Sequence, residues 1–363
     1  MPQTPTTRSP WQRLKKNKGA MLGLCIISLS VLVAIFCYWL ATDRSSNANR
    51  MVVEIGAKKP GYSQLYLKIP ARNTEESNFI ERLMWGETDA YEYLPITSCQ
   101  IHGDSIFVQK YIDEGISEPQ HFSITTLNAA FAPLTYEITK IHYWLGTDKY
   151  GRDILSRLLI GVRVSLAVGL ITVIISLSIG ILLGSLAGYF GGWVDELVMW
   201  IINIIWSIPT LLLVFAITLL LGKGFWQIFI AIGLTMWVSV ARIIRGQVLS
   251  VRSLEYVEAA RALGFSNSRI IIRHILPNVM GPVLVVAASN FATAIVIEAG
   301  LSFLGLGVQP PQPSWGLMIK ENYNFIITHN PMLALAPGLA IMLLVLAFNL
   351  LGNGLRDALE VRA

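Results

Sequence analysis

Six long apolar runs limit what this chain can become, because each is close to the roughly 20 residues that a helix needs to cross a bilayer core. The runs cover residues 19–41, 164–187, 197–221, 226–248, 281–306 and 332–354. Charged residues make up only 14% of the sequence, whereas a soluble domain carries roughly a quarter. The sequence therefore predicts an all-α integral membrane protein with six transmembrane helices.

Basic residues indicate which ends of these helices face the cytoplasm. They gather before the first run, in the loop before the fifth run and in the tail: Arg8, Arg13, Lys15, Lys16 and Lys18; Arg242, Arg245, Arg252, Arg261, Arg269 and Arg273; Arg356 and Arg362. Lys and Arg favour the cytoplasmic side. We therefore expect residues 1–18 and 355–363 to be cytoplasmic, and the net charge of +5 to reflect orientation rather than a nucleic-acid partner. The first run is too long for a signal-peptide core and predicts a membrane anchor.

Residues 42–163 then lie outside the membrane, between the first two spans. Segments 64–69 and 101–111 alternate polar and apolar residues, which is typical of short strands. The sequence predicts a partly β external insert that is too long to be a simple loop.

A polar elbow, residues 252–279, separates the fourth and fifth spans within the predicted core of residues 164–354. Its distinctive residues are Glu258, Ala259, Ala260, Gly264, Leu276 and Pro277. The alanines leave one short helix with a smooth face that another protein could approach. Gly264 is placed to end that helix, Ser266 to cap the next one and Pro277 to close it. The alternative is an ordinary amphipathic connector.

A second segment, residues 146–153, reads GTDKYGRD just before the second span. Its glycines permit tight turns, and Asp148, Arg152, Asp153 and Arg157 could form an ion-pair and hydrogen-bond cluster at the external membrane face. Such a cluster would fix the angle at which the second span enters the membrane. His142 could be added to two of these carboxylates as a metal site, but no ligand spacing supports one.

Polar residues inside spans are costly in lipid and are functional candidates. Asn290, Thr293 and Glu298 in the fifth span could line a pore. Alternatively, Glu298 bonds to backbone or to a partner and locks the assembly. Pro209 in the third span removes one helical hydrogen bond and predicts a kink.

Other spacings point to structure rather than chemistry. Gly180, Gly184 and Gly188 are four residues apart in the second span, which suits close helix packing. The three cysteines indicate neither a disulfide framework nor a metal site. No phosphate-binding GxxxxGK[ST] loop occurs, and no nucleophile with a base is recognisable, so we expect a chain that is not an enzyme and binds no cofactor.

Three motifs together carry a family resemblance. The Glu-Ala-Ala segment with its glycine and Leu-Pro resembles the EAA loop of ABC-importer permeases. The GTDxxGRD segment, together with residues 298–316, resembles the C-type permease of dipeptide, oligopeptide and nickel importers. The likeness covers about 140–360 and the first span, whereas the insert at about 55–135 is longer than that family suggests.

The resemblance implies a six-helix permease of the MetI-like type in the bacterial inner membrane. It implies an elbow that docks on ATPase subunits, and ATP and Mg bound by those subunits alone. The implied partners are a second related permease, two ATPases, an external solute-binding protein and a peptide substrate. A nickel or other small-solute importer is the alternative within the family. From other classes, a membrane-anchored binding or signalling protein acting through the insert, or a membrane hydrolase, stays open.

Overall fold

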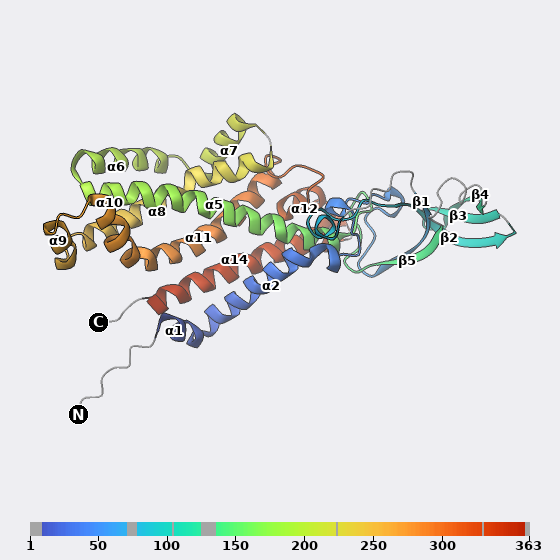
Figure 1. Cartoon of the computed structure of the whole chain (residues 1–363). Helices are drawn as coiled ribbons and strands as arrows, with labels where there is room; N and C mark the ends of the chain where they lie inside the picture. The colour runs from blue at the N-terminus through green and yellow to red at the C-terminus, as the bar shows by residue number, and fades with distance from the viewer. Residues whose placement is uncertain are drawn as a thin grey trace, which may run out of the picture. The chain divides into compact units, whose positions relative to one another are not determined.

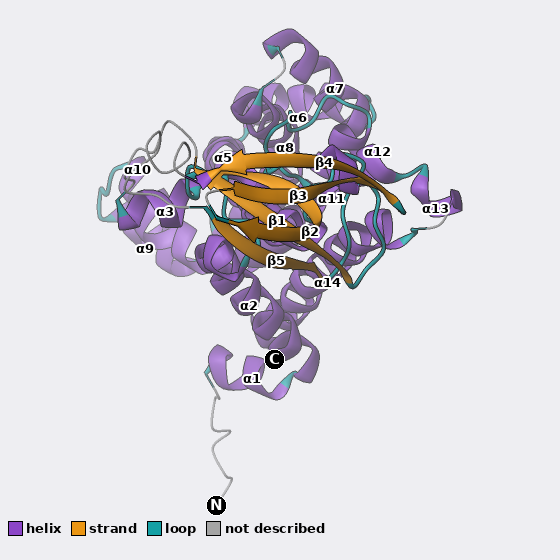
Figure 2. Cartoon of the chain, turned by 90° about the vertical axis from the view of Figure 1, so that its right-hand side faces the viewer, coloured by secondary structure: helices purple, strands orange, loops and turns teal. Residues whose placement is uncertain are grey.

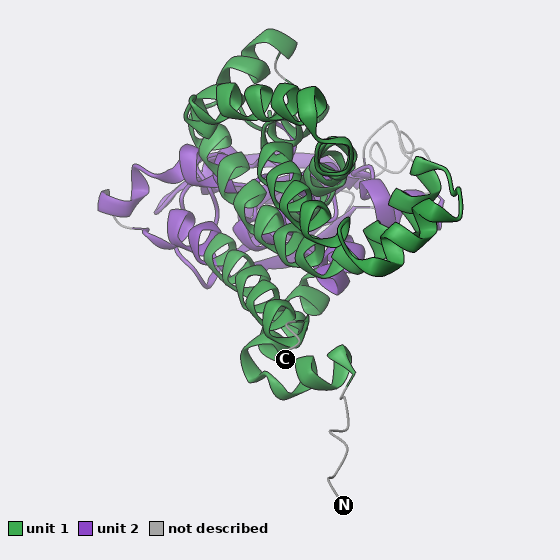
Figure 3. Cartoon of the chain, turned by 90° about the vertical axis from the view of Figure 1, so that its left-hand side faces the viewer, with its two compact units in different colours: residues 1–30, 165–309, 340–363 green, residues 31–164, 310–339 purple. Residues whose placement is uncertain are grey.

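The computed structural model describes residues 9–70, 78–103, 105–124, 136–222, 224–328 and 330–359. Two compact units divide the chain (Figure 3). The helical unit comprises residues 1–30, 165–309 and 340–363, and the sheet unit comprises residues 31–164 and 310–339. Three helices run from one unit into the other along the chain: α2 (Lys18–Leu40), α5 (Ile154–Phe190) and α14 (Met332–Leu359).

The remaining elements follow the chain order shown in Figure 1. In the helical unit these are α1 (Pro10–Lys16), α6 (Gly192–Trp206), α7 (Thr210–Leu221), α8 (Phe225–Val251), α9 (Glu255–Ala262), α10 (Asn267–Ile270), the π-helical turn η3 (Ile271–Ile275) and α11 (Leu276–Phe303). In the sheet unit they are η1 (Ser46–Ala48), η2 (Val53–Ile55), β1 (Tyr62–Pro70), α3 (Phe79–Trp85), β2 (Tyr91–His102), β3 (Ser105–Asp113), β4 (Ile116–Ser123), β5 (Glu137–Tyr143), α12 (Trp315–Asn322) and α13 (Phe325–Thr328).

Within the described residues, five helices are long and apolar enough to cross a membrane, and six spans result if α6 and α7 are counted as one. The predicted all-α membrane fold with a partly β insert is therefore confirmed. The third predicted span, however, is broken rather than kinked, because α6 and α7 meet at 92°. Pro209 has an extended backbone (ψ 126°) before α7 and lacks the N–H that would continue the helix.

The second span also starts earlier than predicted. Helix α5 begins at Ile154 rather than near residue 164. The Asp153 carboxylate accepts a hydrogen bond from the backbone N–H of Ser156, at 3.1 Å, and so caps the first turn. The end of the GTDxxGRD segment is thus the start of a 37-residue helix and not the end of a loop.

A stripe of glycines lets α5 approach α8 closely inside the helical unit. A Cβ added at Gly180 would lie 2.5 Å from Cβ of Val240, and one at Gly184 would lie 2.5 Å from the carbonyl oxygen of Ala241. At Gly188 it would lie 2.8 Å from Cβ of Val248. The four-residue spacing therefore serves backbone contact between two helices.

Five antiparallel strands form the sheet, in the order β4-β3-β2-β1-β5 (Figure 2). Neighbouring residues of β1 face opposite sides: Leu67 packs with Ile96 and Ile106, while the Tyr66 hydroxyl meets the Tyr143 hydroxyl at 2.7 Å. Burial raises the pKa of Tyr66.

The prediction of one strand over residues 101–111 was wrong. A turn at Gly103 (φ +58°) divides that segment between β2 and β3, whose facing ends are His102 and Ser105. The polar-apolar alternation continues on both sides of the turn, which is why the pattern alone read as one strand.

Candidate functional site

Helix α9 is the first half of the elbow, and its two faces differ. Val257 and Ala260 are buried on one face, at 0% and 4% exposure. Glu258 and Ala259 are exposed on the other face, and Leu263, just after the helix, is 73% exposed. The first turn carries Glu255 and Glu258, where a carboxylate favours the positive end of the helix dipole.

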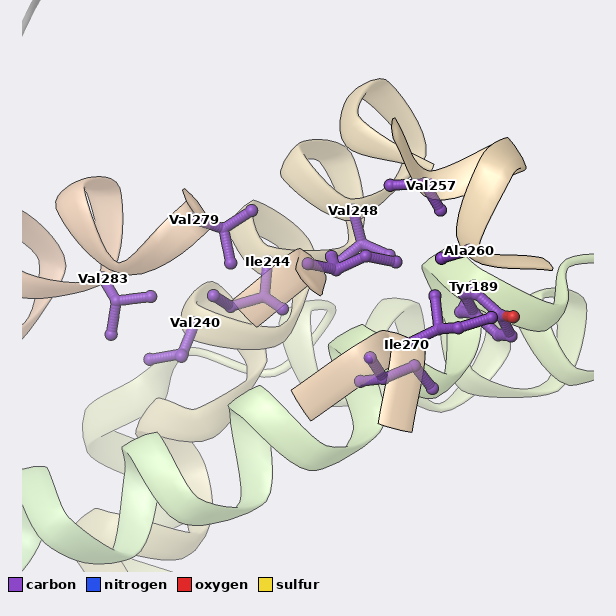
Figure 4. Packing of buried hydrophobic residues seen from close by; sticks show 11 residues of the cluster. Tyr189, Val240, Ile244, Val248, Val257, Ala260, Ile270, Val279 and Val283 are labelled. Atoms are coloured by element: carbon purple, nitrogen blue, oxygen red, sulfur yellow. The ribbon is translucent and has the colours of Figure 1, made fainter. Parts of the chain in front are cut away.

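The buried face belongs to a cluster that joins the elbow to three long helices (Figure 4). Its buried members are Tyr189 of α5; Val240, Ile244 and Val248 of α8; Val257 and Ala260 of α9; Ile270, Ile271 and Ile275; and Val279 and Val283 of α11. Polar contacts reinforce it, since the Tyr189 hydroxyl donates to Oδ1 of Asn267 at 2.9 Å. The Arg252 guanidinium donates to the carbonyls of Gly188 and Tyr189 at 3.0 and 3.2 Å, where α5 ends.

Gly264 ends α9 by the hydrogen-bond pattern of a Schellman motif. Its N–H donates to the carbonyl of Arg261 at 3.0 Å, and the N–H of Phe265 donates to that of Ala260 at 3.2 Å. Gly264 has φ +78°, and nothing lies within 4 Å of where a Cβ would sit. The requirement for glycine here is thus conformational and not one of space.

The expected end of the second elbow helix at Pro277 was wrong. Helix α10, the π-helical turn and α11 form one apolar helix over Asn267–Phe303, so Leu276 and Pro277 lie inside it. In the wide turn, the N–H of Leu276 donates to the carbonyl of Ile271, five residues back. This change of hydrogen-bonding register accommodates a residue without an N–H. Ser266 occupies the position before α10, without a side-chain hydrogen bond there.

At the start of α5, the GTDxxGRD segment brings buried charges together. Arg152 Nε donates to Oδ2 of Asp148 at 2.6 Å, and both side chains are 1% exposed. Arg152 Nη2 also donates to Oε2 of Glu321, in α12, at 2.7 Å. Arg157 Nη2 lies 3.8 Å from the same Glu321 oxygen. We call Asp148, Arg152, Asp153, Arg157 and Glu321 the α5 entry cluster.

Asp153 plays a different part from the other members of the cluster. Its Oδ2 accepts from both the N–H and the hydroxyl of Ser156, at 3.1 and 2.5 Å, while its buried Oδ1 has no hydrogen-bond partner among the described residues. Burial raises the pKa of this carboxyl. Sequence reasoning missed Glu321, because no local spacing links it to a segment so far away in the chain.

The three polar residues of the fifth span separate in the structure. Asn290 and Thr293 line a cavity of about 220 Å³, whereas Glu298 is not among its lining residues. Glu298 is 1% exposed and accepts a hydrogen bond from the Ser302 hydroxyl at 2.6 Å. Ser302 Oγ in turn accepts from the N–H of Val308 at 3.1 Å, so Glu298 holds the turn after α11.

Comparison with known proteins places this architecture. Residues 180–363, which are 184 of the 363, match the family model of binding-protein-dependent transport system inner membrane components. The chain belongs to this family of permeases. Residues 6–53 of the permease also match the N-terminal transmembrane domain of oligopeptide transport permease C.

Individual relatives agree with the family match. The permease is 45% identical over 218 residues to a dipeptide transport system permease protein of Alkalihalophilus pseudofirmus, covering 60% of this chain and 71% of the relative. It is 43% identical over 218 residues to a glutathione transport system permease protein of Pectobacterium atrosepticum, covering 60% and 72%. An inward-facing structure of the MetNI methionine ABC transporter is similar over 56% of this chain and 97% of that chain, with a TM-score of 0.47 and 20% identity.

The predicted C-type permease is thereby confirmed at the level of the family. The permease is a transmembrane transport subunit of an ABC importer, crossing the bacterial inner membrane several times. Separate ATPase subunits and a substrate-binding protein work with a permease of this kind.

Proposed function

We propose that the permease carries small peptides and supplies one half of a translocation path, with a second, related permease supplying the other half. Two features support the proposal: the match to an oligopeptide permease domain, and relatives named for dipeptide and glutathione transport. Two partner ATPases would bind ATP and Mg, and this chain would bind no cofactor. Peptides would arrive from an external binding protein.

We assign the contact with the ATPases to the elbow, with both chain termini on the same, cytoplasmic side. The observation that carries this assignment is the difference between the two faces of α9. Its buried face is already used by the chain's own core, whereas its exposed face leads to the open side chain of Leu263. A small-sided helix ending in an exposed leucine suits a groove on another subunit.

Within the elbow, Glu258, Ala259 and Ala260 form the docking helix and Gly264 sets the turn after it. Leu276 and Pro277 carry the movement into α11, because the helix is continuous there. At the other end of the helices, the α5 entry cluster of Asp148, Arg152, Asp153 and Arg157 would hold the start of α5 in one orientation.

Substitution of Gly264 tests the docking assignment. Proline fixes φ near −65° and cannot adopt the +78° seen here, whereas asparagine tolerates the left-handed region. In proteoliposomes that contain the complete importer, Gly264→Pro should uncouple uptake from ATP hydrolysis, and Gly264→Asn should keep the two coupled. Glu258→Lys should resemble the proline variant, and Glu258→Gln should be milder.

Membrane insertion is checked for every variant by its yield in the detergent-solubilised complex. Normal peptide uptake by correctly inserted Gly264→Pro and Glu258→Lys would show that the elbow does not transmit the ATPase movement.

A further inference from the structure

A polar cavity lies where α6 and α7 bend, inside a region that the family places in the membrane. It is about 220 Å³ in volume and is lined by Ile205, Trp206, Thr210, Leu213, Thr235, Met236, Ser239, Asn290 and Thr293. All of these residues belong to the helical unit. Because the two halves of the broken span diverge by 92°, side chains of α8 and α11 are left uncovered at the bend.

Hydrogen-bond acceptors line one side of this cavity. Thr235 and Ser239 are one turn apart on α8, and their hydroxyls donate to carbonyls of their own helix at 2.8 and 3.0 Å. The Thr293 hydroxyl of α11 does the same at 3.0 Å. Each hydroxyl has therefore used its single proton and keeps oxygen lone pairs for an N–H donor from elsewhere.

One donor faces them from α11. Asn290 is 6% exposed, and its side-chain NH₂ has no hydrogen-bond partner among the described residues. Leaving a buried amide N–H unsatisfied is costly, and more so where lipid replaces water. The arrangement of one free donor with several free acceptors matches the pattern of a peptide backbone, which carries a C=O and an N–H on each residue.

A cation lies at the mouth of the cavity. The guanidinium of Arg242 lies over the ring of Trp206, 4.4 Å from the ring centroid. Arg242 follows Ser239 by three residues on the same stripe of α8 and is exposed. No carboxylate among the residues that the structure describes pairs with it, whereas Arg245, on the next face, is paired with Asp195.

We propose that this cavity binds the carboxyl-terminal residue of a peptide in transit. Asn290 would donate to the peptide carbonyl, the hydroxyls of Thr235, Ser239 and Thr293 would accept from its N–H groups, and Arg242 would pair with the free carboxylate. A planar guanidinium already held on an aromatic ring is well suited to a carboxylate. The inference rests on the proposed peptide substrate and adds a recognition site to it.

The size of the cavity fits this role. Its volume corresponds to about seven liquid waters, enough for one residue and too little for a whole peptide. The cavity would thus read the end of the chain and leave the rest outside, so that peptides of different sequence could share it.

The test uses the complete importer in proteoliposomes, fed through its binding protein with a mixed library of di- and tripeptides. Mass spectrometry of the vesicle lumen identifies a transported peptide. That peptide is then compared with its carboxyl-terminal amide. The wild type should take up the free acid about tenfold better than the amide, because a hydrogen bond to a charged group is lost with the carboxylate. In Arg242→Gln this preference should fall to near one, and Arg242→Lys should keep part of it.

Ser239→Ala and Asn290→Ala should raise the KM for the peptide while ATP hydrolysis without peptide stays unchanged. Ser30→Ala is the matched control, because the Ser30 hydroxyl makes the same kind of bond, to the Ile26 carbonyl at 2.9 Å, away from the cavity. It should leave the KM unaltered.

The outcomes separate the two proposals. If the importer takes up no peptide from the library, the peptide substrate is wrong, and the cavity assignment is overturned with it. If peptides are taken up but the acid-to-amide ratio is the same in wild type and Arg242→Gln, the transport proposal stands and the recognition site is wrong.

Discussion

At the scale of single residues, burial of charge at the start of α5 is handled differently for each side chain. Arg152 lies between two carboxylates, those of Asp148 and Glu321. Arg157 shares Glu321 at a longer distance. Asp153 has no cation partner among the described residues and relies on the N–H and hydroxyl of Ser156. The cluster therefore contains one carboxylate whose charged form is poorly stabilised.

This difference predicts a pH effect on stability. Burial raises the pKa of Asp153 above its ordinary value of about 3.9. Between those two pKa values the folded form holds the proton that the unfolded form has lost, so stability falls as the pH rises. Relative to Asp153→Asn, which has no such proton, the wild-type permease should lose stability on going from about pH 4 upward, and the gap should become constant above the raised pKa.

Thermal unfolding of both proteins in detergent, measured across that range, gives the gap directly. Comparing a pair of proteins cancels the titration of the other carboxylates. A gap that stays constant at all pH values would mean that the Asp153 carboxyl is not perturbed.

At the scale of elements, helix packing depends on the absence of side chains along one line of α5. Gly180, Gly184 and Gly188 each bring the backbone within reach of α8. In lipid, where apolar side chains gain little by leaving the solvent, such close backbone contact is a main source of helix association. The α5–α8 pair thus positions the helix that carries Thr235, Ser239 and Arg242.

Gly184→Val should weaken this pair. The added Cβ would lie 2.5 Å from the carbonyl of Ala241, so the helices must move apart, at a cost of about 1–3 kcal/mol. Gly338→Ala is the control, because no atom lies within 4 Å of the new Cβ and alanine favours a helix interior. Gly184→Val should lower the thermal midpoint in detergent and Gly338→Ala should not. Equal midpoints would show that α5 and α8 are not in contact at Gly184.

The elements also show where sequence reasoning succeeds and fails. Local signals sufficed at Gly264, where one residue both ends a helix and adopts a positive φ. They misled at Pro277, because proline ends a regular α-helix but fits after a π-helical turn, which no composition reveals. Glu321 could not be found at all, since its contact with Arg152 depends on the tertiary fold. The 92° break was foreseen only as a kink, because Pro209 shows where hydrogen bonding stops but not the angle.

At the scale of the whole molecule, the orientation proposed from Lys and Arg has a direct consequence for cysteine chemistry. Cys99 lies in β2 of the insert and is partly exposed. Cys25 and Cys37 lie within α2. Leu263, on the elbow, is exposed and falls on the opposite side of the membrane in the proposed orientation.

A membrane-impermeant maleimide should therefore label Cys99 in intact spheroplasts, and Cys99→Ser should remove that signal. In the Cys99→Ser background, Leu263→Cys should react only after the membrane is opened. Burial raises the pKa of the Cys99 thiol, so its labelling should speed up as the pH rises. Labelling of Leu263→Cys in intact spheroplasts would reverse the proposed orientation.

The π-helical turn at Ile271–Ile275 has one more consequence, which concerns angle rather than distance. Asn267 and Asn290 belong to one helix, 23 residues and so about 35 Å apart along its axis. Each residue of a helix turns the chain by about 100°, so the extra residue in the wide turn sets the rotational phase of everything after it. Phe265 and the elbow are at one end of this shaft and the Asn290 amide is at the other. The direction in which Asn290 points is thus fixed by a single inserted residue five turns away, much as a key fixes a cam on its axle.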